Sequence, residues 1–420
     1  MPSVEGLAAR RAALQMLDAV LRRGRTLESA AAGAKGLPPN DQALAVAIAG
    51  EALRRIPDLD ELIDSATRQR LADDSKARMV LRIALAQKVG LATPDHALVA
   101  TALPLVDGGP RRLVHGVLGT LLRRGVPAMD APRLPGPVEE RWSAMWGGDA
   151  VAAARRQIAH RPPLDLGFAN DEQAQTFAAQ TKGVSIAPRH VRLHDAGTVS
   201  DLPRFEEGRW WVQDLAASLP ARLISTAAES VLDLCAAPGG KTMQIAAAGH
   251  RVTAVDSSGS RLGRLRENLL RTGLDATLVE ADALSWRPDG QFDAILLDAP
   301  CSATGTFRRH PEVLYRARPS IVRDSAELQS ALIRRAASWL KLGGSLVYSL
   351  CSLEREEGED VIRGFIEQDS RFRMDPPAPG ELPDFAAPSP EGWVRILPGL
   401  LESEGGLDGF FVARLVRTAT

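Results

Sequence analysis

The chain has 420 residues, of which 45% are hydrophobic and 25% are charged, and its formal net charge is −1. These proportions are typical of globular proteins, so a wholly disordered, collagen-like or low-complexity chain is excluded. At about 150 residues per domain, the length favours two or three domains. We find no run of about 18 uncharged apolar residues and no apolar segment in the N-terminal MPSVEGLAARR, so we expect neither a membrane span nor a secretory signal.

Residues 1–126 are predicted to form an all-helical domain. Apolar residues recur at helical spacing over residues 4–23, and Gly24 is expected to end that helix. A second helix is expected to begin at Pro39 and to run through Leu53. The further predicted helices are 58–67, 74–88, 94–104 and 111–124. The separators are short and contain Gly, Pro or Asp, which favours a compact bundle.

The charge of this first part of the chain is mildly positive. Residues 1–130 contain 18 Lys and Arg against 14 Asp and Glu, a balance of +4. This bias is compatible with a module that faces RNA. The same balance is common in domains that touch no nucleic acid, and on this observation alone the second interpretation is favoured.

The middle of the chain is predicted to contain a connector and a small subdomain. Residues 127–163 begin with a proline-rich stretch and continue with a helical pattern over 138–158. Residues 164–222 mix turns with the short strand-like runs LDLGF, VSIAP, HVRLH and GRWWVQD, which indicates a small α+β subdomain.

From residue 223 to residue 420 short apolar runs alternate with helical patterns. The predicted strands are 231–235, 251–256, 276–280, 292–300 and 345–351, and the predicted helices include 261–272 and 324–341. This alternation predicts an α/β domain with a doubly wound parallel sheet. Residues 374–400 contain seven prolines and are expected to be irregular, and 409–416 is expected to be a closing edge strand.

A glycine-rich turn, DLCAAPGGKT at residues 233–242, follows the first of these strands. A Walker A loop would need glycine at Cys235, and a G-x-G-x-x-G fingerprint is absent. The remaining interpretation is the glycine turn of a class I methyltransferase. In such a turn the backbone approaches the ligand, and the carboxylate of S-adenosylmethionine lies at the N-terminus of the following helix.

Acidic residues follow the neighbouring strands. Asp256 is placed to accept hydrogen bonds from ribose hydroxyls, Asp282 to reach the adenine, and Asp298 to lie beside the methyl-donor end of the site. One such aspartate is often only a helix cap. Together with Asp233, however, four consecutive strands bring an aspartate to the carboxyl edge of the sheet, where open α/β sheets bind their ligands.

The three cysteines are Cys235, Cys301 and Cys351. They are too few for a disulfide framework, which predicts a cytoplasmic location, and their spacing matches no zinc site, so no metal is expected. Cys301 follows the fourth strand and Cys351 the fifth, so both thiols are expected at the inferred cofactor edge. A lone cysteine is usually a small buried apolar residue, but two at one edge favour chemistry. One reaction that needs a thiol is methylation of carbon 5 of cytosine, because addition of a thiolate at carbon 6 makes carbon 5 nucleophilic.

Several segments carry a resemblance to a known family. DLCAAPGGKT, LLDAPCSATGTFRRHPE, YSLCS, WVQDLAAS and DGFFVARL resemble segments of the RsmB/NOL/NOP/Sun group of RNA cytosine-5 methyltransferases. ARRAALQMLDAVLRRG and LVHGVLGTLLRRG resemble the NusB-type domain of its bacterial members. The resemblance spans nearly the whole chain. It implies a Rossmann-like methyltransferase domain that uses S-adenosylmethionine, preceded by a NusB-like RNA-binding domain.

The resemblance also implies site roles. Cys351 becomes the nucleophile, and Cys301 becomes the second cysteine that helps to release the methylated product. The residues expected to contact the cofactor or the target base are Cys235, Ala236, Ala237, Pro238, Gly239, Gly240, Lys241, Asp256, Asp282 and Asp298. This sequence departs from the family at Leu350, where threonine is usual, and at His115, where asparagine is frequent.

Three further features leave two interpretations open. Lys241 offsets negative charge or anchors the loop. The basic run 308–310 holds RNA phosphates or is a solvated loop, the latter slightly favoured without the family. Trp210 and Trp211 stack on a base or pack under the cofactor domain, and packing is favoured for at least one of them.

The resemblance favours 16S ribosomal RNA as the partner and substrate. The sequence does not determine the oligomeric state, for which a monomer is favoured. Two alternatives are a tRNA cytosine-5 methyltransferase and a non-catalytic RNA-binding assembly factor. The intact Cys351, Cys301 and glycine turn count against the second alternative.

Overall fold

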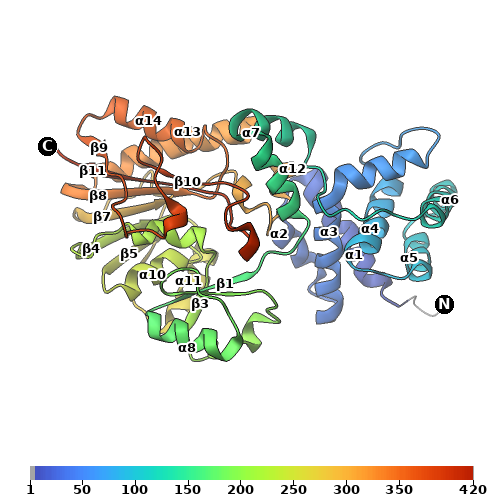
Figure 1. Ribbon diagram of the computed structural model, residues 1–420, viewed down its shortest axis with the longest axis horizontal. Helices are drawn as coiled ribbons and strands as arrows, with labels where there is room; N and C mark the ends of the chain where they lie inside the picture. The colour runs from blue at the N-terminus through green and yellow to red at the C-terminus, as the bar shows by residue number, and fades with distance from the viewer. Residues whose placement is uncertain (1–4, 420) are drawn as a thin grey trace. The chain divides into compact units, whose positions relative to one another are not determined.

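The computed structural model describes residues 5–419, which form two compact units (Figure 1). The first, here called the helical unit, contains the chain up to Arg161 together with Phe307–Ala317. The second, here called the sheet unit, contains Pro162–Thr306 and the chain from Arg318 onward. The helical unit is therefore discontinuous in sequence. Among residues 5–419 no helix is long and apolar enough to cross a membrane.

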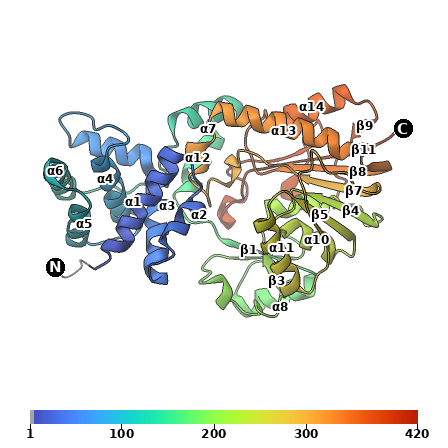
Figure 2. The same ribbon diagram turned by 180° about the vertical axis from the view of Figure 1, so that it is seen from behind.

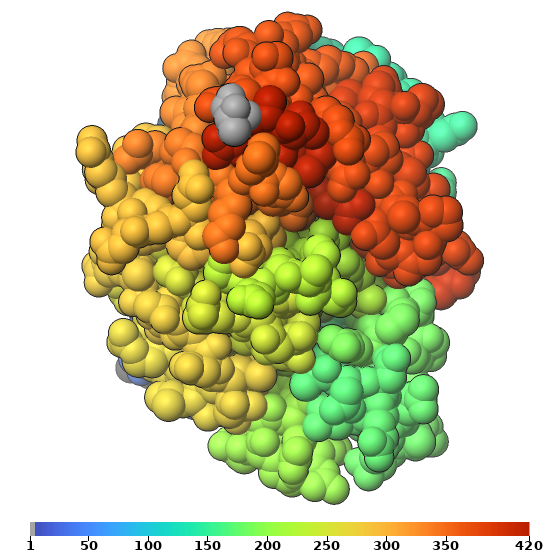
Figure 3. Space-filling model, turned by 90° about the vertical axis from the view of Figure 1, so that its left-hand side faces the viewer, coloured from blue at the N-terminus to red at the C-terminus, as the bar shows by residue number. Residues whose placement is uncertain are grey.

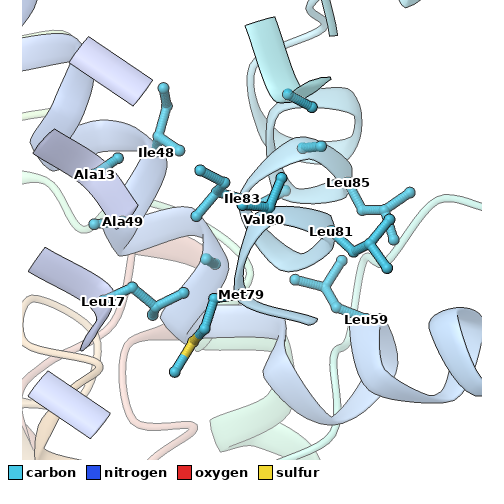
Figure 4. Packing of buried hydrophobic residues seen from close by; sticks show 14 of the residues in the cluster. Ala13, Leu17, Ile48, Ala49, Leu59, Met79, Val80, Leu81, Ile83 and Leu85 are labelled. Carbon is cyan, nitrogen blue, oxygen red and sulfur yellow. The ribbon is translucent and has the colours of Figure 1, made fainter. Parts of the chain in front are cut away.

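The helical unit is built from amphipathic helices around one apolar core. Its α-helices are α1 (Leu7–Arg23), α2 (Leu27–Ala31), α3 (Pro39–Ser65), α4 (Lys76–Gly90), α5 (Asp95–Ala102), α6 (Gly108–Arg124), α7 (Gly136–Ile158) and α12 (Val313–Arg316). Gly24 ends α1 with a φ of 64°, as expected from the sequence. Side chains from α1, α3 and α4 interlock in the core, among them Leu17, Ile48 and Val80, all fully buried (Figure 4).

The prediction of separate helices before and after residue 57 is wrong, because α3 runs through Pro57 without a break. A proline inside a helix has no N–H to donate to the carbonyl four residues earlier, here that of Leu53. The phenol of Tyr315 replaces that donor, with a distance of 2.9 Å from Oη to the Leu53 oxygen. Tyr315 lies in the 307–317 segment, so a residue distant in sequence donates the hydrogen bond that Pro57 cannot give to the Leu53 carbonyl.

The sheet unit begins with a three-stranded antiparallel sheet in the order β2-β1-β3. Its elements are β1 (Leu164–Phe168), α8 (Asp171–Thr181), β2 (His190–Leu193) and β3 (Trp210–Val212). The run VSIAP forms no strand and contributes only an isolated bridge between Val184 and Arg192. In Figure 3 the green residues of this region gather at the lower end of the sheet unit.

The main sheet has the order β10-β11-β8-β7-β4-β5-β6, and β9 pairs with β11. Its strands are β4 (Ser230–Leu234), β5 (Arg251–Asp256), β6 (Thr277–Glu280), β7 (Phe292–Asp298), β8 (Leu340–Leu350), β9 (Phe372–Met374), β10 (Val394–Ile396) and β11 (Phe410–Arg417). The five strands from β8 to β6 are parallel, which confirms the doubly wound α/β prediction. The prediction of a closing edge strand is wrong, because β11 runs antiparallel between β8 and β10.

The strand predicted over 345–351 begins earlier, because Gly343 and Gly344 already lie inside β8. The strand already pairs at Leu340 with Phe292, and the register then shifts before Ser345 pairs with Ala294. The preceding helix, α13 (Pro319–Ala337), accordingly ends earlier than the sequence pattern predicts. The two glycines thus lie in an irregular segment within the strand.

Helices cover both faces of this sheet, as the two opposite views show (Figures 1 and 2). Apolar residues on one face of the strands, including Leu232 and Ile295, pack with α13 and α14 (Glu359–Gln368). Residues of the other face, including Val231 and Leu296, pack with α9 (Leu219–Arg222) and α10 (Gly240–Ala247). Successive strand residues thus face opposite helical layers. Because both faces of these strands are buried, their sequences are uninterrupted apolar runs. The remaining helix, α11 (Gly259–Thr272), packs its leucines against Ala254.

Candidate functional site

The glycine turn joins β4 to α10 at the carboxyl edge of the sheet. Cys235 and Gly239 have φ values of 59° and 107°, so the chain reverses through left-handed backbone. A Cβ at Gly239 would lie 2.0 Å from Cδ1 of Leu265 in α11. Glycine is therefore required at this position both for its backbone conformation and for its close approach to α11. The N-terminus of α10 therefore lies at the carboxyl edge of the sheet, where the sequence predicts the cofactor.

Asp256 holds the turn from the end of β5. Its Oδ2 accepts a hydrogen bond from the Ala237 N–H at 3.1 Å, and its Oδ1 accepts one from the Ser258 N–H at 2.9 Å. The guanidinium of Arg261 lies 3.1 Å from Oδ2. Asp256 is buried, and its carboxylate is thus fixed beside the turn.

Asp298 and Lys241 form an ion pair across the ends of β7 and α10. The distance from Nζ of Lys241 to Oδ2 of Asp298 is 2.7 Å, and Asp298 also accepts a hydrogen bond from Oγ of Ser349 at 2.9 Å. Lys241 lies 5.2 Å from the ring centre of Phe410. Lys241 therefore both neutralises an acid and ties the turn to the neighbouring strand, so neither interpretation from the sequence excludes the other.

Asp282 occupies a different environment. It is exposed after β6, and its Oδ1 accepts a hydrogen bond from the Leu284 N–H at 3.0 Å, so it stabilises its own turn. None of the described contacts of its side chain joins it to Asp256, Asp298 or the cysteines. It lies at the same edge of the sheet only through the parallel pairing of β5 with β6.

Asp233 is the site acid with the most unusual surroundings. It is completely buried in β4, its Oδ2 accepts a hydrogen bond from Oγ1 of Thr242 at 2.6 Å, and its Oδ1 has no hydrogen-bond partner. Burial raises the pKa of Asp233 to about 7, and the charges of Asp298 and Asp256 act in the same direction. A buried oxygen without a donor next to the glycine turn fits the ammonium group of an amino-acid ligand.

The structure brings Cys301 and Cys351 together. β7 and β8 are neighbours, and the two sulfur atoms that follow them are 3.6 Å apart. The hydrogen bond with Cys351, burial and the charge of Glu357 together raise the pKa of the Cys301 thiol well above its ordinary value. The third cysteine, Cys235, lies in the glycine turn, where burial and three neighbouring aspartates raise its pKa to about 12. Cys235 is therefore held as a neutral thiol.

Two interpretations from the sequence are settled by burial. Trp210 and Trp211 are 0% and 2% exposed, and the indole N–H of Trp211 donates to Oε1 of Gln213 at 2.7 Å. Packing is thus confirmed for both rings, and stacking on a base is not available to them. Within the run 308–310, Arg308 is 1% exposed and is not solvated, whereas Arg309 is half-buried and His310 is exposed, so the solvated-loop interpretation fails only for Arg308.

Sequence reasoning missed the polar residues that support these groups. Arg261 contacts the glycine turn and Glu357 contacts the loops that contain Cys301 and Cys351, but neither of them occupies the end of a strand. Gln213 directly follows β3, and its Nε2 donates to Oε1 of Gln244 in α10 at 3.0 Å. Glu357 lies in a run of acids of which Glu354 and Glu359 are also buried, so the sequence pattern does not single it out. Among residues 5–419 no group of three or more His, Cys, Asp or Glu side chains is arranged to hold a metal ion.

Comparison with known proteins shows the family of the chain. Residues 221–416 match a family model described as 16S rRNA methyltransferase RsmB/F, and residues 7–123 match the NusB family. The chain is 31% identical to the ribosomal RNA small subunit methyltransferase B of Cronobacter sakazakii, over 96% of this chain and 97% of that protein. It is 33% identical to the protein of that name from Xanthomonas campestris, over 99% and 98% of the two chains.

A solved structure shares the fold. The crystal structure of PH0851 superposes with a TM-score of 0.74 at 22% identity and covers 99% of each chain. The likeness in sequence and the likeness in fold thus extend over both units. The chain belongs to the RsmB/F family of 16S rRNA methyltransferases and has a NusB-type helical domain on its N-terminal side.

Proposed function

We propose that this protein methylates carbon 5 of a cytosine in small-subunit ribosomal RNA, with Cys351 as the nucleophile. The observation that carries the proposal is the pair of thiols 3.6 Å apart at the ends of adjacent strands, at the same sheet edge as the glycine turn. The family membership supports ribosomal RNA as the substrate, and the names of the relatives in Cronobacter and Xanthomonas point to the small subunit.

S-adenosylmethionine, when bound, supplies an electrophilic methyl group. The residues that would hold it are those of the turn, Cys235 to Lys241, with Asp256, Asp282 and Asp298 around them. Oδ1 of Asp233 supports this assignment, because it is a buried acceptor without a hydrogen-bond partner and could accept one from the ammonium group of the ligand. The N-terminus of α10 offers free N–H groups and a partial positive charge to a carboxylate.

The two thiols have different roles in the covalent reaction. The sulfur of Cys351 adds to carbon 6 of cytosine, and the electron pair of the carbon 5–carbon 6 double bond makes carbon 5 nucleophilic. After carbon 5 has taken the methyl group, a base removes its proton, the double bond re-forms and the bond to Cys351 breaks. Cys301, whose raised pKa keeps a proton on its sulfur, is next to the leaving thiolate.

The test is to follow covalent adducts between the protein and small-subunit ribosomal RNA. Cys301→Ala should accumulate an adduct that survives denaturing electrophoresis, because addition proceeds and release stalls. Cys351→Ala should form no adduct and transfer no methyl group, yet bind S-adenosylmethionine as the unaltered protein does. The double variant should form no adduct.

Three results would contradict the proposal. An adduct with Cys351→Ala and none with Cys301→Ala would reverse the two roles. Methyl transfer to tRNA rather than ribosomal RNA would change the substrate. Unimpaired RNA binding without any methyl transfer by the unaltered protein would favour an assembly factor.

A further inference from the structure

Glu357 is a buried acid that lies just before α14 and faces the two cysteine loops. It is 0% exposed. Its Oε1 accepts hydrogen bonds from the Ser302 N–H at 2.7 Å and from Nε2 of Gln329 at 3.3 Å. Its Oε2 accepts hydrogen bonds from the hydroxyls of Ser302 and Ser352. One carboxylate thus receives four hydrogen bonds, and the two serines that donate three of them come from different loops.

These serines directly follow the two cysteines in sequence. Each thiol is therefore one residue away from a donor to the same carboxylate. The loops are also joined to each other, since the Ser302 and Ser352 hydroxyl oxygens are 3.0 Å apart and the Gly305 N–H donates to the Cys351 carbonyl at 2.9 Å. The backbone of Glu357 is fixed in turn by Oη of Tyr348, which donates to its carbonyl at 2.6 Å.

We propose that Glu357 is a positioning residue that holds the Cys301 and Cys351 loops together through Ser302 and Ser352 and so sets the spacing of the two thiols. The role of that spacing in a reaction rests on the proposed cytosine chemistry. The contact itself does not, because it is made within the protein. A carboxylate that accepts several hydrogen bonds fixes its donors strongly, since hydrogen bonds to a charged group are stronger than those between neutral groups.

The charge of Glu357 has a second effect on the same pair. Burial raises the pKa of Glu357, while its hydrogen bonds from Ser302 and Ser352 oppose that shift. The charge of Glu357 in turn raises the pKa of Cys301, in addition to the effects of Cys351 and burial. The other charged or titratable groups around this cluster are Tyr348, Glu354, Glu359 and Arg395. Glu357 therefore favours the protonated form of Cys301, the form needed beside a leaving thiolate.

The first experiment needs no RNA. Cys235→Ala with Cys351→Ala leaves Cys301 as the only thiol in the full chain. Its rate of alkylation by iodoacetamide at about pH 8.5 reports its thiolate fraction. Adding Glu357→Gln should raise this rate about tenfold, which corresponds to a pKa lower by about one unit. Glu381→Gln, which removes a different acid of the sheet unit paired with Arg414, should leave the rate unchanged. Equal rates with and without Glu357→Gln would overturn the effect on Cys301.

The second experiment measures methyl transfer and adduct release in the chain with all three cysteines. Glu357→Ala removes the shared acceptor and should slow methyl transfer about 100-fold, because reacting groups displaced by about 1 Å lose roughly that factor. Glu357→Gln should recover most of the rate. The amide oxygen can still accept hydrogen bonds, and a serine hydroxyl can accept one from the amide NH2 group, so the side chain still joins the two loops. Binding of S-adenosylmethionine should be unchanged in both variants.

The outcomes separate the two proposals. A Gln variant as slow as the Ala variant, or an Ala variant as fast as the unaltered protein, would overturn the positioning role. If the unaltered protein methylates no cytosine, the proposed function fails, while the alkylation rates still decide whether Glu357 controls Cys301.

Discussion

Two buried aspartates of the sheet unit show how neighbours decide the charge of a carboxyl group. Asp165 in β1 receives two hydrogen bonds of 2.7 Å from the guanidinium of Arg192 and one of 3.0 Å from the Leu215 N–H. Burial alone would raise the pKa of Asp165, but the hydrogen bonds from Arg192 and the proximity of His190 outweigh it and hold the pKa below its usual range. Asp233, with a single hydroxyl donor, is shifted the opposite way. Both are buried aspartates in strands, so the sequence pattern does not distinguish them.

Asp165→Asn should destabilise the sheet unit strongly, because it leaves Arg192 buried beside a neutral amide. Breaking a buried ion pair costs about 3–5 kcal/mol. The pKa of Asp165 is lower in the folded than in the unfolded chain, so its stabilisation is present above about pH 4 and is lost as the pH falls further. Urea unfolding at several pH values should show this acid-dependent loss, and the loss should be smaller in the variant, in which only the other carboxyl groups with a lowered pKa, such as Asp293 and Glu381, still contribute. Asp369→Asn, which breaks an ion pair with the exposed Arg371, should cost less than about 1 kcal/mol; an equal loss in both variants would contradict the assignment.

The raised pKa of Asp233 predicts a pH-dependent affinity for S-adenosylmethionine. Below about pH 7 Asp233 is protonated in the free protein, whereas an ammonium group at Oδ1 favours the ionised form. Binding then releases a proton, so affinity should increase as the pH rises from 5.5 to 7, by up to about tenfold per unit, and should level off above the pKa. Calorimetric titration across this range measures it. Asp233→Asn should bind weakly with no slope, and a slope that persists in this variant would assign the titration to another group.

At the scale of single elements, the sequence predicts what depends on local pattern. The strands β4, β5 and β7 are recognisable because both of their faces are buried, so their apolar runs are continuous. The glycine turn is recognisable because Gly239 is required sterically. The position of β11 between β10 and β8 is not recognisable, since pairing order depends on contacts between distant segments. The continuity of α3 through Pro57 has the same cause, because its missing donor comes from Tyr315.

Tyr315→Phe should therefore destabilise α3 by about 1–3 kcal/mol, the cost of a buried carbonyl that loses its donor. Pro57→Ala restores an N–H four residues after Leu53 and should supply the missing bond within the helix. The double variant should then recover most of the stability that Tyr315→Phe loses. Urea unfolding of the four proteins forms a double-mutant cycle, and additive effects would show that Tyr315 does not replace the donor at Pro57.

At the scale of the whole molecule, the 307–317 segment completes the helical unit. Oε1 of Glu312 accepts a hydrogen bond from the Leu27 N–H at 3.0 Å, and Nε of Arg316 donates to the Gly24 carbonyl at 2.8 Å. Phe307 is fully buried, and its ring centre lies 5.5 Å from that of Trp142. The segment thus satisfies polar groups at the junction of α1 with α2 and fills part of the apolar core.

A fragment of residues 1–161 should accordingly be less stable than the same fragment joined by a flexible linker to residues 307–317. Burial of one large apolar side chain contributes about 1.5–3 kcal/mol, and Phe307 and Leu314 are both buried in this segment. We expect the joined fragment to unfold at a clearly higher urea concentration. A joined fragment with Phe307→Ala and Tyr315→Phe serves as the control and should lose most of the gain. Equal midpoints for all three fragments would show that the segment is dispensable.

The broken sequence of the helical unit also constrains how the protein is made. A ribosome releases the chain from its N-terminus, and domains generally fold as units while synthesis continues. Here the first unit to emerge lacks its last piece until residue 317 of 420 has been translated, with residues 162–306 produced in between. During that interval Trp142 lacks its contact with Phe307, and the Leu53 carbonyl lacks the hydrogen bond from Tyr315. A fusion protein that contains only residues 1–161 would therefore lack the 307–317 segment of the helical unit.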